Sequence, residues 1–273
     1  RGRIVDADVL SGDRMRCVAP PALGEGLVFV GVANNLQDFS AGSVTFRYAL
    51  PPRITGVQPV SGPDMGGTTV TVVGDNFVNS EQLLCRFGDT DPEATEPRFV
   101  TRARWHSQVR ISCLTPAQSP GSASLEVTAN GLDYTAEGFV FAVVETVTVT
   151  SIDPALGPVR GGTVVTIVGK NFGPRNAFCR FGHVGRVPAL RLSAHVVRCA
   201  APPSRGRTGP VNLEVSTNNA DFSQTGIPFE YIPHAAIAAV SPEEGDVDRE
   251  TLLTLSMKDA LLTPGDTGFC RFN

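Results

Sequence analysis

Six cysteines are the residues of this chain whose type and spacing could do chemistry, as metal ligands, nucleophiles or disulfide partners. They are Cys17, Cys85, Cys113, Cys179, Cys199 and Cys270. A structural zinc site usually takes its ligands from Cys-x-x-Cys pairs and closely spaced histidines. No Cys-x-x-Cys occurs, and the four histidines show no ligand spacing. Disulfides are therefore favoured, and the alternative that stays open is a set of reduced cysteines acting as small apolar core residues.

Other patterns that could carry catalysis are incomplete. The segment from Gly162 to Lys170 lacks the glycine spacing and the final Ser or Thr of a phosphate-binding loop. Neither a Gly-x-Ser-x-Gly elbow nor a His-Glu-x-x-His motif is present. An acidic stretch with Asp89, Asp91 and Glu93 offers oxygen ligands for calcium, but it lacks a loop signature, so a solvated loop is favoured. We therefore predict no catalytic, cofactor-binding or metal-binding residues, and we expect that the chain is not an enzyme.

Composition and charge exclude further classes of protein. The 273 residues include 28 glycines and 21 prolines, which disfavour long helices. The net charge is −4 and the basic residues are scattered, whereas nucleic-acid-binding surfaces are basic and clustered. No run of 18 apolar residues occurs, so no membrane-spanning helix is expected.

Internal repetition is the main signal of organisation. Three landmarks recur: Cys-Arg-Phe at 85–87, 179–181 and 270–272; Cys-x-x-Pro at 17–20, 113–116 and 199–202; and Phe-x-aromatic at 46–48, 139–141 and 229–231. Successive Cys-Arg-Phe blocks are 94 and 91 residues apart. A period of this length fits one small sandwich domain rather than a short solenoid repeat.

Within each period the sequence is typical of strands. Residues 70–73 and 164–168 are β-branched runs bounded by glycines, and residues 125–128 alternate between apolar and polar. Turn signals such as Asn130-Gly131 stand between these runs. Many short strands without helical periodicity predict an all-β fold of antiparallel sandwiches.

An ordered set of motifs occurs twice. The first copy has Ile-Thr-Gly-Val-Gln-Pro at 54–59, Ser-Gly-Pro at 61–63, Gly-Gly-Thr at 66–68 and Gly-Asp-Asn-Phe at 74–77. The second has Ile-Asp-Pro at 152–154, Gly-Pro at 157–158, Gly-Gly-Thr at 161–163 and Gly-Lys-Asn-Phe at 169–172. This set resembles the opening of an IPT/TIG domain, the immunoglobulin-like module of plexins, scatter-factor-type receptors and long cell-surface arrays. The resemblance implies tandem immunoglobulin-like β-sandwiches in an extended rod.

The phase of the repeat divides the chain into four units. We expect the C-terminal half of an IPT/TIG domain at 1–50, complete domains at 51–147 and 148–233, and the N-terminal half of a divergent domain at 234–273. In the last unit Asp-Arg-Glu-Thr at 248–251 replaces Gly-Gly-Thr. Because half a sandwich cannot bury its apolar face alone, we expect the parent protein to continue in both directions.

The division assigns two cysteines to each complete domain. We expect one disulfide within each of these domains: Cys85 with Cys113, and Cys179 with Cys199. Cys17 and Cys270 stand singly in the two half domains and are expected to bond partners outside this segment. Disulfides form in oxidising compartments, so an extracellular or cell-surface location in the secretory pathway is expected.

The length of each junction can be counted from the aromatic landmark of one unit to the first isoleucine of the next. By this count, the junction between the two complete domains is longer than the other two junctions. It spans 11 residues where the others span six. The extra stretch, 143–150, has strong β-propensity. We predict a strand that crosses between the domains and could add to a neighbouring sheet, with Val143, Val147 and Val149 as candidate interface residues. A longer strand inside one domain is the equal alternative. Trp105, the one tryptophan, is a further interface candidate, although a half-buried role is favoured.

These features predict a non-enzymatic structural or adhesive spacer in a long extracellular tandem-repeat protein, with a cell-surface or flagellar filament as one setting. One alternative is the ligand-binding stalk of a plexin-like or scatter-factor-like receptor ectodomain. Another is a carbohydrate-binding or enzyme-accessory module, which the single tryptophan and three tyrosines do not favour. The expected partners are other proteins, namely further domains of the same chain and neighbouring subunits of an extracellular assembly. No cofactor, nucleic acid or membrane span is expected.

Overall fold

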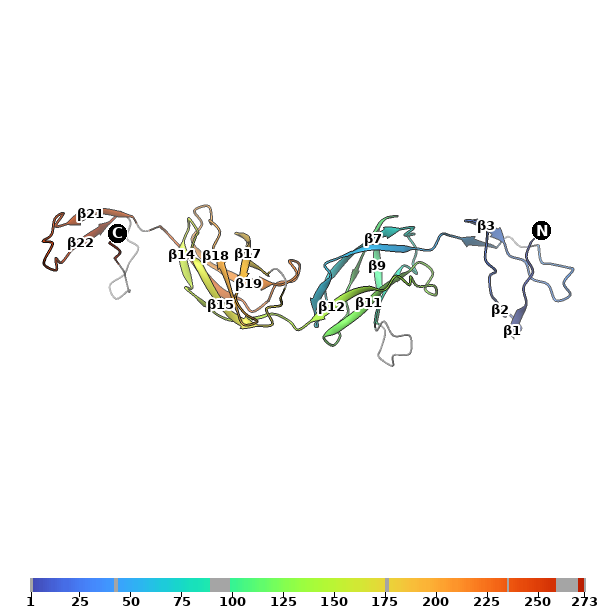
Figure 1. Cartoon of the computed structure of the whole chain (residues 1–273). Helices are drawn as coiled ribbons and strands as arrows, with labels where there is room; N and C mark the ends of the chain where they lie inside the picture. The colour runs from blue at the N-terminus through green and yellow to red at the C-terminus, as the bar shows by residue number, and fades with distance from the viewer. Residues whose placement is uncertain are drawn as a thin grey trace.

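The chain folds into β-sandwiches. The computed structural model describes residues 2–41, 44–88, 99–174, 177–234, 236–258 and 270–272. These residues form strands only, with no helix among them, which confirms the predicted all-β class; accordingly, no helix in these ranges could cross a membrane. The acidic stretch with Asp89, Asp91 and Glu93 lies outside the described residues. Figure 1 shows two sandwiches end to end, with further strand pairs beyond each of them.

The first sandwich has eight strands. They are β5 (Arg53–Gln58), β6 (Ser61–Pro63), β7 (Thr69–Asp75), β8 (Leu84–Gly88), β9 (Phe99–Ser107), β10 (Arg110–Leu114), β11 (Gly121–Thr128) and β12 (Phe139–Val144). They are hydrogen-bonded in the order β5-β7-β10-β9-β8-β11-β12-β6. The long strand β9 pairs with β8 through its first half and with β10 through its second half. It therefore passes from one layer of the sandwich to the other.

The second sandwich repeats this order strand for strand. Its strands are β13 (Thr148–Asp153), β14 (Leu156–Pro158), β15 (Val164–Lys170), β16 (Ala177–Phe181), β17 (Gly185–Arg191), β18 (Val196–Ala200), β19 (Gly209–Ser216) and β20 (Ile227–Ile232). They are paired as β13-β15-β18-β17-β16-β19-β20-β14. Strands β7 and β15 also share one alternation of buried and exposed residues, because every second side chain of a strand points to the same face.

Each sandwich has its own core between its two layers. The first core is built from Ile54, Val70, Val72, Phe77, Leu83, Cys85, Phe87, Ile111, Cys113, Ala123, Leu125, Val127, Phe141 and Val143. The second is built from Val149, Val165, Ile167, Phe172, Ala177, Cys179, Phe181, Val197, Cys199, Ala201, Leu213, Val215, Phe229 and Tyr231. The two sets form separate clusters, so each sandwich buries its apolar side chains independently.

A disulfide joins the two layers of each sandwich. Cys85 on β8 is bonded to Cys113 on β10, and Cys179 on β16 to Cys199 on β18. The Cα atoms of the pairs are 6.3 and 6.4 Å apart, within the usual range for disulfides. All four cysteines are buried. Each bond therefore spans a core at the edge where β9 or β17 changes layers.

Among the described residues, three strand pairs lie outside the two sandwiches. They are β1 (Ala7–Ser11) with β2 (Arg14–Cys17), β3 (Gly26–Phe29) with β4 (Thr45–Tyr48), and β21 (Ile237–Ser241) with β22 (Thr254–Met257). Apolar side chains on these pairs are largely exposed: Val9 is 73%, Leu27 69% and Phe29 77% accessible. Cys17 and Cys270 are exposed and unpaired among the described residues.

A tyrosine hydroxyl fastens the last strand of a unit to the Cys-x-x-Pro segment. Tyr231 donates to the carbonyl of Pro202, and Tyr48 donates to that of Pro20, both at 2.7 Å. In the first sandwich the same position is taken by Val143, which is paired with Gly121 as Tyr231 is with Gly209. Burial raises the pKa of Tyr231 to about 12 from its usual 10.0.

Replacing both Cys179 and Cys199 with alanine is expected to destabilise the second sandwich by about 3 kcal/mol, because the bond closes a loop of 20 residues in the unfolded chain. Differential scanning calorimetry of the full chain would show one transition lowered and the other unmoved. The matched double variant of Cys85 and Cys113 should lower the other transition instead. An equal shift of both transitions would contradict independent cores.

Tyr231→Phe is expected to cost the second sandwich about 1 kcal/mol, the contribution of one hydrogen bond. It should also remove a pH dependence. In the native sandwich Tyr231 stays protonated up to pH about 12, whereas in the unfolded chain it ionises near pH 10. This contribution to stability is complete below pH 10 and is lost as the pH rises from 10 to 12. Urea titrations across that window should show a steeper loss for the parent chain than for Tyr231→Phe; parallel curves would contradict the assignment.

Candidate functional site at the junction between the sandwiches

Polar side chains converge where the first sandwich meets the second. We call them the junction cluster: Ser61, Asp64, Thr68, Thr146, Asn171, Asn218 and Asp221. In the ranges that the structure describes, no three His, Cys, Asp or Glu side chains lie close enough together to hold a metal ion. The cluster consists instead of neutral donors and carboxylate or carbonyl acceptors, a set suited to fixing one protein surface against another.

Thr146, in the short linker between β12 and β13, is held from both sandwiches. Asp64 of the first sandwich accepts hydrogen bonds from its backbone nitrogen at 3.1 Å and from its hydroxyl at 2.5 Å. Asn171 of the second sandwich donates from Nδ2 to the carbonyl of Thr146 at 2.9 Å. Three polar groups of a single linker residue are thus bonded to protein groups, which restricts rotation about the linker.

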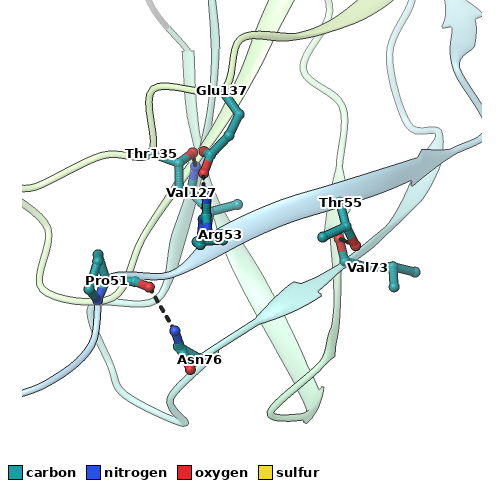
Figure 2. A network of polar contacts seen from close by, with 8 residues as sticks. All are labelled: Pro51, Arg53, Thr55, Val73, Asn76, Val127, Thr135 and Glu137. Carbon is teal, nitrogen blue, oxygen red and sulfur yellow. Dashed lines mark hydrogen bonds and ion pairs between the residues drawn. The ribbon is translucent and has the colours of Figure 1, made fainter.

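The asparagine of the Gly-x-Asn-Phe motif has the same role at the connection before the first sandwich. Asn76 donates from Nδ2 to the carbonyl of Pro51 at 3.0 Å, as Figure 2 shows. Asn76 and Asn171 have φ angles of 62° and 64°, a left-handed conformation that asparagine tolerates better than most residues. Figure 2 also shows Arg53, just after Pro51, paired with Glu137 at 3.8 Å on the same end of the sandwich.

The glycine of this motif allows the first strand of each sandwich to begin close to the strand that carries the motif. A Cβ atom added to Gly169 would stand 2.1 Å from the carbonyl oxygen of Thr148 and 2.7 Å from the ring of Phe172. Gly74 is in the same position beside Arg53, with 1.9 Å to its carbonyl oxygen. The motif therefore combines a close backbone approach with a side chain that anchors the linker.

A turn between β19 and β20 carries the second part of the cluster. Asn218 Oδ1 accepts hydrogen bonds from the backbone nitrogens of Ala220 and Asp221 at 3.0 and 2.8 Å. Asn219 has a left-handed φ of 61°. Such a side-chain acceptor two residues before its donor replaces a backbone hydrogen bond and fixes the turn. We call this segment, and its counterparts in the other units, the Asn-x-x-Asp turn.

The arginine of the Cys-Arg-Phe landmark packs against the aromatic residue that follows the turn. Arg180 lies over the ring of Phe222 at 4.3 Å from its centroid, and it also pairs with Glu214. The first sandwich has the same arrangement, with Arg86 over Tyr134 at 3.8 Å. A landmark recognised by its spacing therefore positions the residue that follows the turn's aspartate.

The turn of the second sandwich is bonded to the first. Asp221 Oδ2 accepts from the hydroxyl of Thr68 at 2.7 Å and from Nδ2 of Asn218, also at 2.7 Å. Asn218 donates in addition to the backbone carbonyl of Ser61 at 2.8 Å. Thr68 is 0% and Ser61 6% exposed. The two sandwiches are therefore in contact at a second place besides the linker.

The space left between these contacts is small. A cavity of about 40 Å³ is lined by Gly62, Pro63 and residues 144–147 on one side and by Thr217, Asn218, Asp221, Phe222 and Ser223 on the other. Sites for small organic ligands are several hundred Å³ in volume. The junction can thus hold a few water molecules but not a ligand of that size.

The Asn-x-x-Asp turn occurs in three units of the chain. Asn35 accepts from the nitrogens of Gln37 and Asp38, and Asn130 from those of Leu132 and Asp133. The asparagine amide also donates to the aspartate in each turn, at 2.7 Å. Both earlier aspartates, Asp38 and Asp133, are exposed, whereas Asp221 is half-buried. The third turn differs from the other two because the first sandwich covers it.

The predicted crossing strand is absent, because both landmarks used to measure the junction are displaced: the aromatic one by two residues and the first isoleucine by three. Val143, rather than Phe141, corresponds to Tyr48 and Tyr231, because each of the three pairs with the first glycine of the neighbouring strand. Val149 pairs with Gly169 as Ile54 pairs with Gly74. Counted between these positions the junction has six residues, like the others, so it contains no extra stretch.

Of the four candidate interface residues, three are buried or partly buried and Trp105 is exposed. Val143 is 5% exposed in the first core, and Val149 is 3% exposed in the second. Val147 is partly buried and packs against the second core. Trp105 is 36% exposed and donates from Nε1 to the carbonyl of Phe77 at 3.0 Å. In the second sandwich, Arg191 makes the equivalent bond to Phe172, so this hydrogen bond is a structural feature of both units.

Sequence patterns indicate only part of the junction cluster. Ser61, Thr68 and Asn171 belong to the repeated motifs, but the motifs do not indicate their role. Asn218 and Asp221 carried a usable signal, because Asn-x-x-Asp followed by an aromatic residue and Ser or Thr occurs at 35, 130 and 218. Asp64 is not repeated, because Val159 occupies the equivalent position in the second sandwich. The repeat pattern therefore does not indicate Asp64.

Comparison with known proteins identifies the units. The family model described as "IPT/TIG domain" matches residues 52–141 and 147–231, which is more than half of the chain. The chain belongs to the IPT/TIG family. Both matched segments coincide with the two sandwiches, and the junction cluster lies between the two IPT/TIG domains.

Curated relatives are found among large proteins. Plexin-A3 of Rattus norvegicus is 26% identical over 206 residues, covering 75% of this chain and 11% of its own length. Fibrocystin-L of Homo sapiens is 25% identical over 233 residues, covering 83% of this chain and 5% of its own length. The chain thus spans about a tenth or less of these relatives. Among solved structures, the full extracellular region of Plexin A4 aligns with 80% of this chain and 19% of its own, at 20% identity and a TM-score of 0.47.

Asp221→Ala is expected to loosen the orientation of the two IPT/TIG domains while leaving each folded, because hydrogen bonds to a charged acceptor each contribute about 1–3 kcal/mol and two are lost. Residual dipolar couplings should fit one alignment tensor for both domains in the parent chain and two unequal tensors in the variant. Asp133→Ala is the matched control, since it removes the same contact within its own turn but none to another sandwich. Equal behaviour of the two variants would contradict the role of Asp221.

Proposed function

We propose that this chain is a non-enzymatic spacer segment of an extracellular tandem-repeat protein, in which successive IPT/TIG domains are held in a fixed orientation. The observation that carries the proposal is the double attachment of the two sandwiches. The linker is bonded through Thr146, and the Asn-x-x-Asp turn is bonded through Asp221 to Thr68. Two separate attachments resist both bending and twisting, which a single linker does not.

The proposed extracellular location is supported by the buried disulfides and by the relatives. Both complete sandwiches have a disulfide across the core, and such bonds persist in oxidising compartments. Plexin-A3 is among the relatives that match three quarters of the chain. The proposed partners are accordingly proteins, namely the neighbouring domains of the same chain and other subunits of an extracellular assembly.

The proposal includes the division into four units at 1–50, 51–147, 148–233 and 234–273. The outer two are assigned as parts of further IPT/TIG domains. Their support is the hydrogen bond of Tyr48 to Pro20, which matches that of Tyr231, and the exposure of apolar strand residues that a second layer would cover. Cys17 and Cys270 are proposed to form the disulfides of those domains once a partner cysteine is present.

Between the two settings for such a spacer, the relatives favour the stalk of a plexin-like receptor ectodomain over a filament. Plexin-A2, Plexin-A3 and Plexin-A4 proteins all match the same share of this chain, 75%. A filament requires lateral contacts between chains, and two of the valines expected to supply them, Val143 and Val149, are packed in the two cores. A stalk needs only the contacts along the chain.

The spacer proposal is tested by nitrogen-15 relaxation and small-angle X-ray scattering of the full chain. We expect both sandwiches to tumble with one anisotropic rotational diffusion tensor, because the two attachments prevent independent rotation. Scattering should fit one elongated particle rather than an ensemble of bent forms. Separate diffusion tensors for the two sandwiches would overturn the proposal.

Electron microscopy of the native parent protein, isolated without denaturant, separates the two settings. Single rods attached to membrane, without lateral association, support the receptor stalk. A fibre with a regular axial repeat that contains this chain in stoichiometric amount supports the filament.

A further inference from the structure

The turn of the second sandwich is bonded to a surface at the end of the first sandwich. The second sandwich has an equivalent surface, and nothing covers it among the described residues. On the first sandwich, that surface is formed by strand β6 and by Thr68, and the turn of the next domain covers it. Its counterpart is strand β14 together with Thr163. Leu156 occupies the place of Ser61, since both are paired in parallel to the last strand of their sandwich. Leu156 is 50% exposed where Ser61 is 6%, and Thr163 is half-buried where Thr68 is fully buried.

The local geometry of the two surfaces is the same. A Cβ atom on Gly62 would lie 2.2 Å from the Thr68 hydroxyl, and one on Gly157 would lie 2.3 Å from that of Thr163. The threonine is therefore placed against the same backbone in both sandwiches. The uncovered surface offers the groups that the turn uses, namely a threonine hydroxyl and the backbone carbonyl of the first residue of the short strand.

The chain also places a following unit at the right distance. Six residues separate Tyr231 from Ile237, as six separate Val143 from Val149. The pairing of β21 with β22 has an irregularity after Ile237, and the pairing of β13 with β15 has one after Val149, the equivalent position. A unit that begins with β21 thus enters at the same register as the second sandwich does behind the first.

We propose that Leu156, Gly157 and Thr163 form the docking surface for the Asn-x-x-Asp turn of the IPT/TIG unit that begins with β21. The Thr163 hydroxyl donates to the aspartate of that turn, and the carbonyl of Leu156 accepts from its asparagine amide. The Leu156 side chain adds an apolar contact that Ser61 lacks. This inference rests on the proposed spacer function, because both require successive units to be in contact.

This second junction lacks one attachment of the first. Val159 stands where Asp64 does, since each donates its backbone nitrogen to the same position of the last strand. His234 stands where Thr146 does, three residues after Tyr231 as Thr146 is after Val143, and it contacts Arg160. Without a carboxylate to hold the linker, the docked turn is the main restraint on orientation at this junction.

The test is a tandem duplication of residues 149–236, inserted after Ala236 in the full chain, which supplies a complete following unit at the native spacing. Trypsin distinguishes the two copies, because the peptide that holds Leu156 begins after Arg110 in the original copy and after Arg207 for the inserted copy. Hydroxyl-radical footprinting then reports the accessibility of each Leu156. Leu156 is 50% exposed in the unduplicated chain, whereas its covered counterpart Ser61 is 6% exposed. We expect the oxidation of the original Leu156 in the duplicated chain to fall in the ratio of these two exposed fractions.

Replacing Asn218 and Asp221 with alanine in the inserted copy alone should restore oxidation of the original Leu156. The same replacements in the original copy alone should leave it protected, and they serve as the matched control. Unchanged oxidation of Leu156 in the duplicated chain, or protection that survives the replacements in the inserted copy, would overturn the inference. The spacer function is tested separately by nitrogen-15 relaxation of the two sandwiches on either side of the first junction. The docking inference and the spacer proposal can therefore fail independently.

If calorimetry shows no added transition for the inserted copy, a disulfide-cyclised peptide of residues 216–223 is added to the full chain instead. The inference expects saturable shifts of the Leu156 methyl resonances that are lost with the Asp221→Ala peptide. No shift, or equal shifts with both peptides, would overturn it.

Discussion

The carboxylate of Asp221 is the point on which the arrangement of the two sandwiches depends. It accepts one hydrogen bond from Asn218 within its own turn and one from Thr68 of the preceding sandwich. The first bond fixes the turn, and the second fixes the turn to its neighbour. Since a charged acceptor makes stronger hydrogen bonds than a neutral one, a single half-buried side chain can couple the local shape of a loop to the orientation of two domains.

Everything that brings Asp221 to this position belongs to the repeat. Arg180 of the Cys-Arg-Phe block packs on Phe222, and the disulfide from Cys179 holds that block across the core. The same construction supports the turn of the first sandwich through Arg86 and Tyr134. The residues that define the family pattern thus stabilise a sandwich and also present a preformed contact at one of its ends. A preformed contact loses little conformational entropy when it binds, which favours tandem assembly.

The sequence was sufficient for the fold class and the repeat, because strands, glycine turns and cysteine spacing are local or periodic signals. It was insufficient for the register of the last strand, where Val143 replaces a tyrosine and the neighbouring Phe139 imitates the aromatic landmark. A shift of two residues keeps each side chain on the same face of a strand, so alternation cannot detect it. The contacts of Asp221 with Thr68 were beyond sequence reasoning, since the two residues are 153 positions apart and their pairing depends on how one sandwich sits on the other.

The repeat preserves the turn in three units but does not preserve the attachment of the linker. Asp64 holds Thr146 at the first junction, whereas the corresponding residues at the next are Val159 and His234. Stiffness along such an array is therefore set junction by junction, by substitutions at the ends of the sandwiches. A tandem array can in this way combine stiff and compliant joints while every domain retains the same architecture.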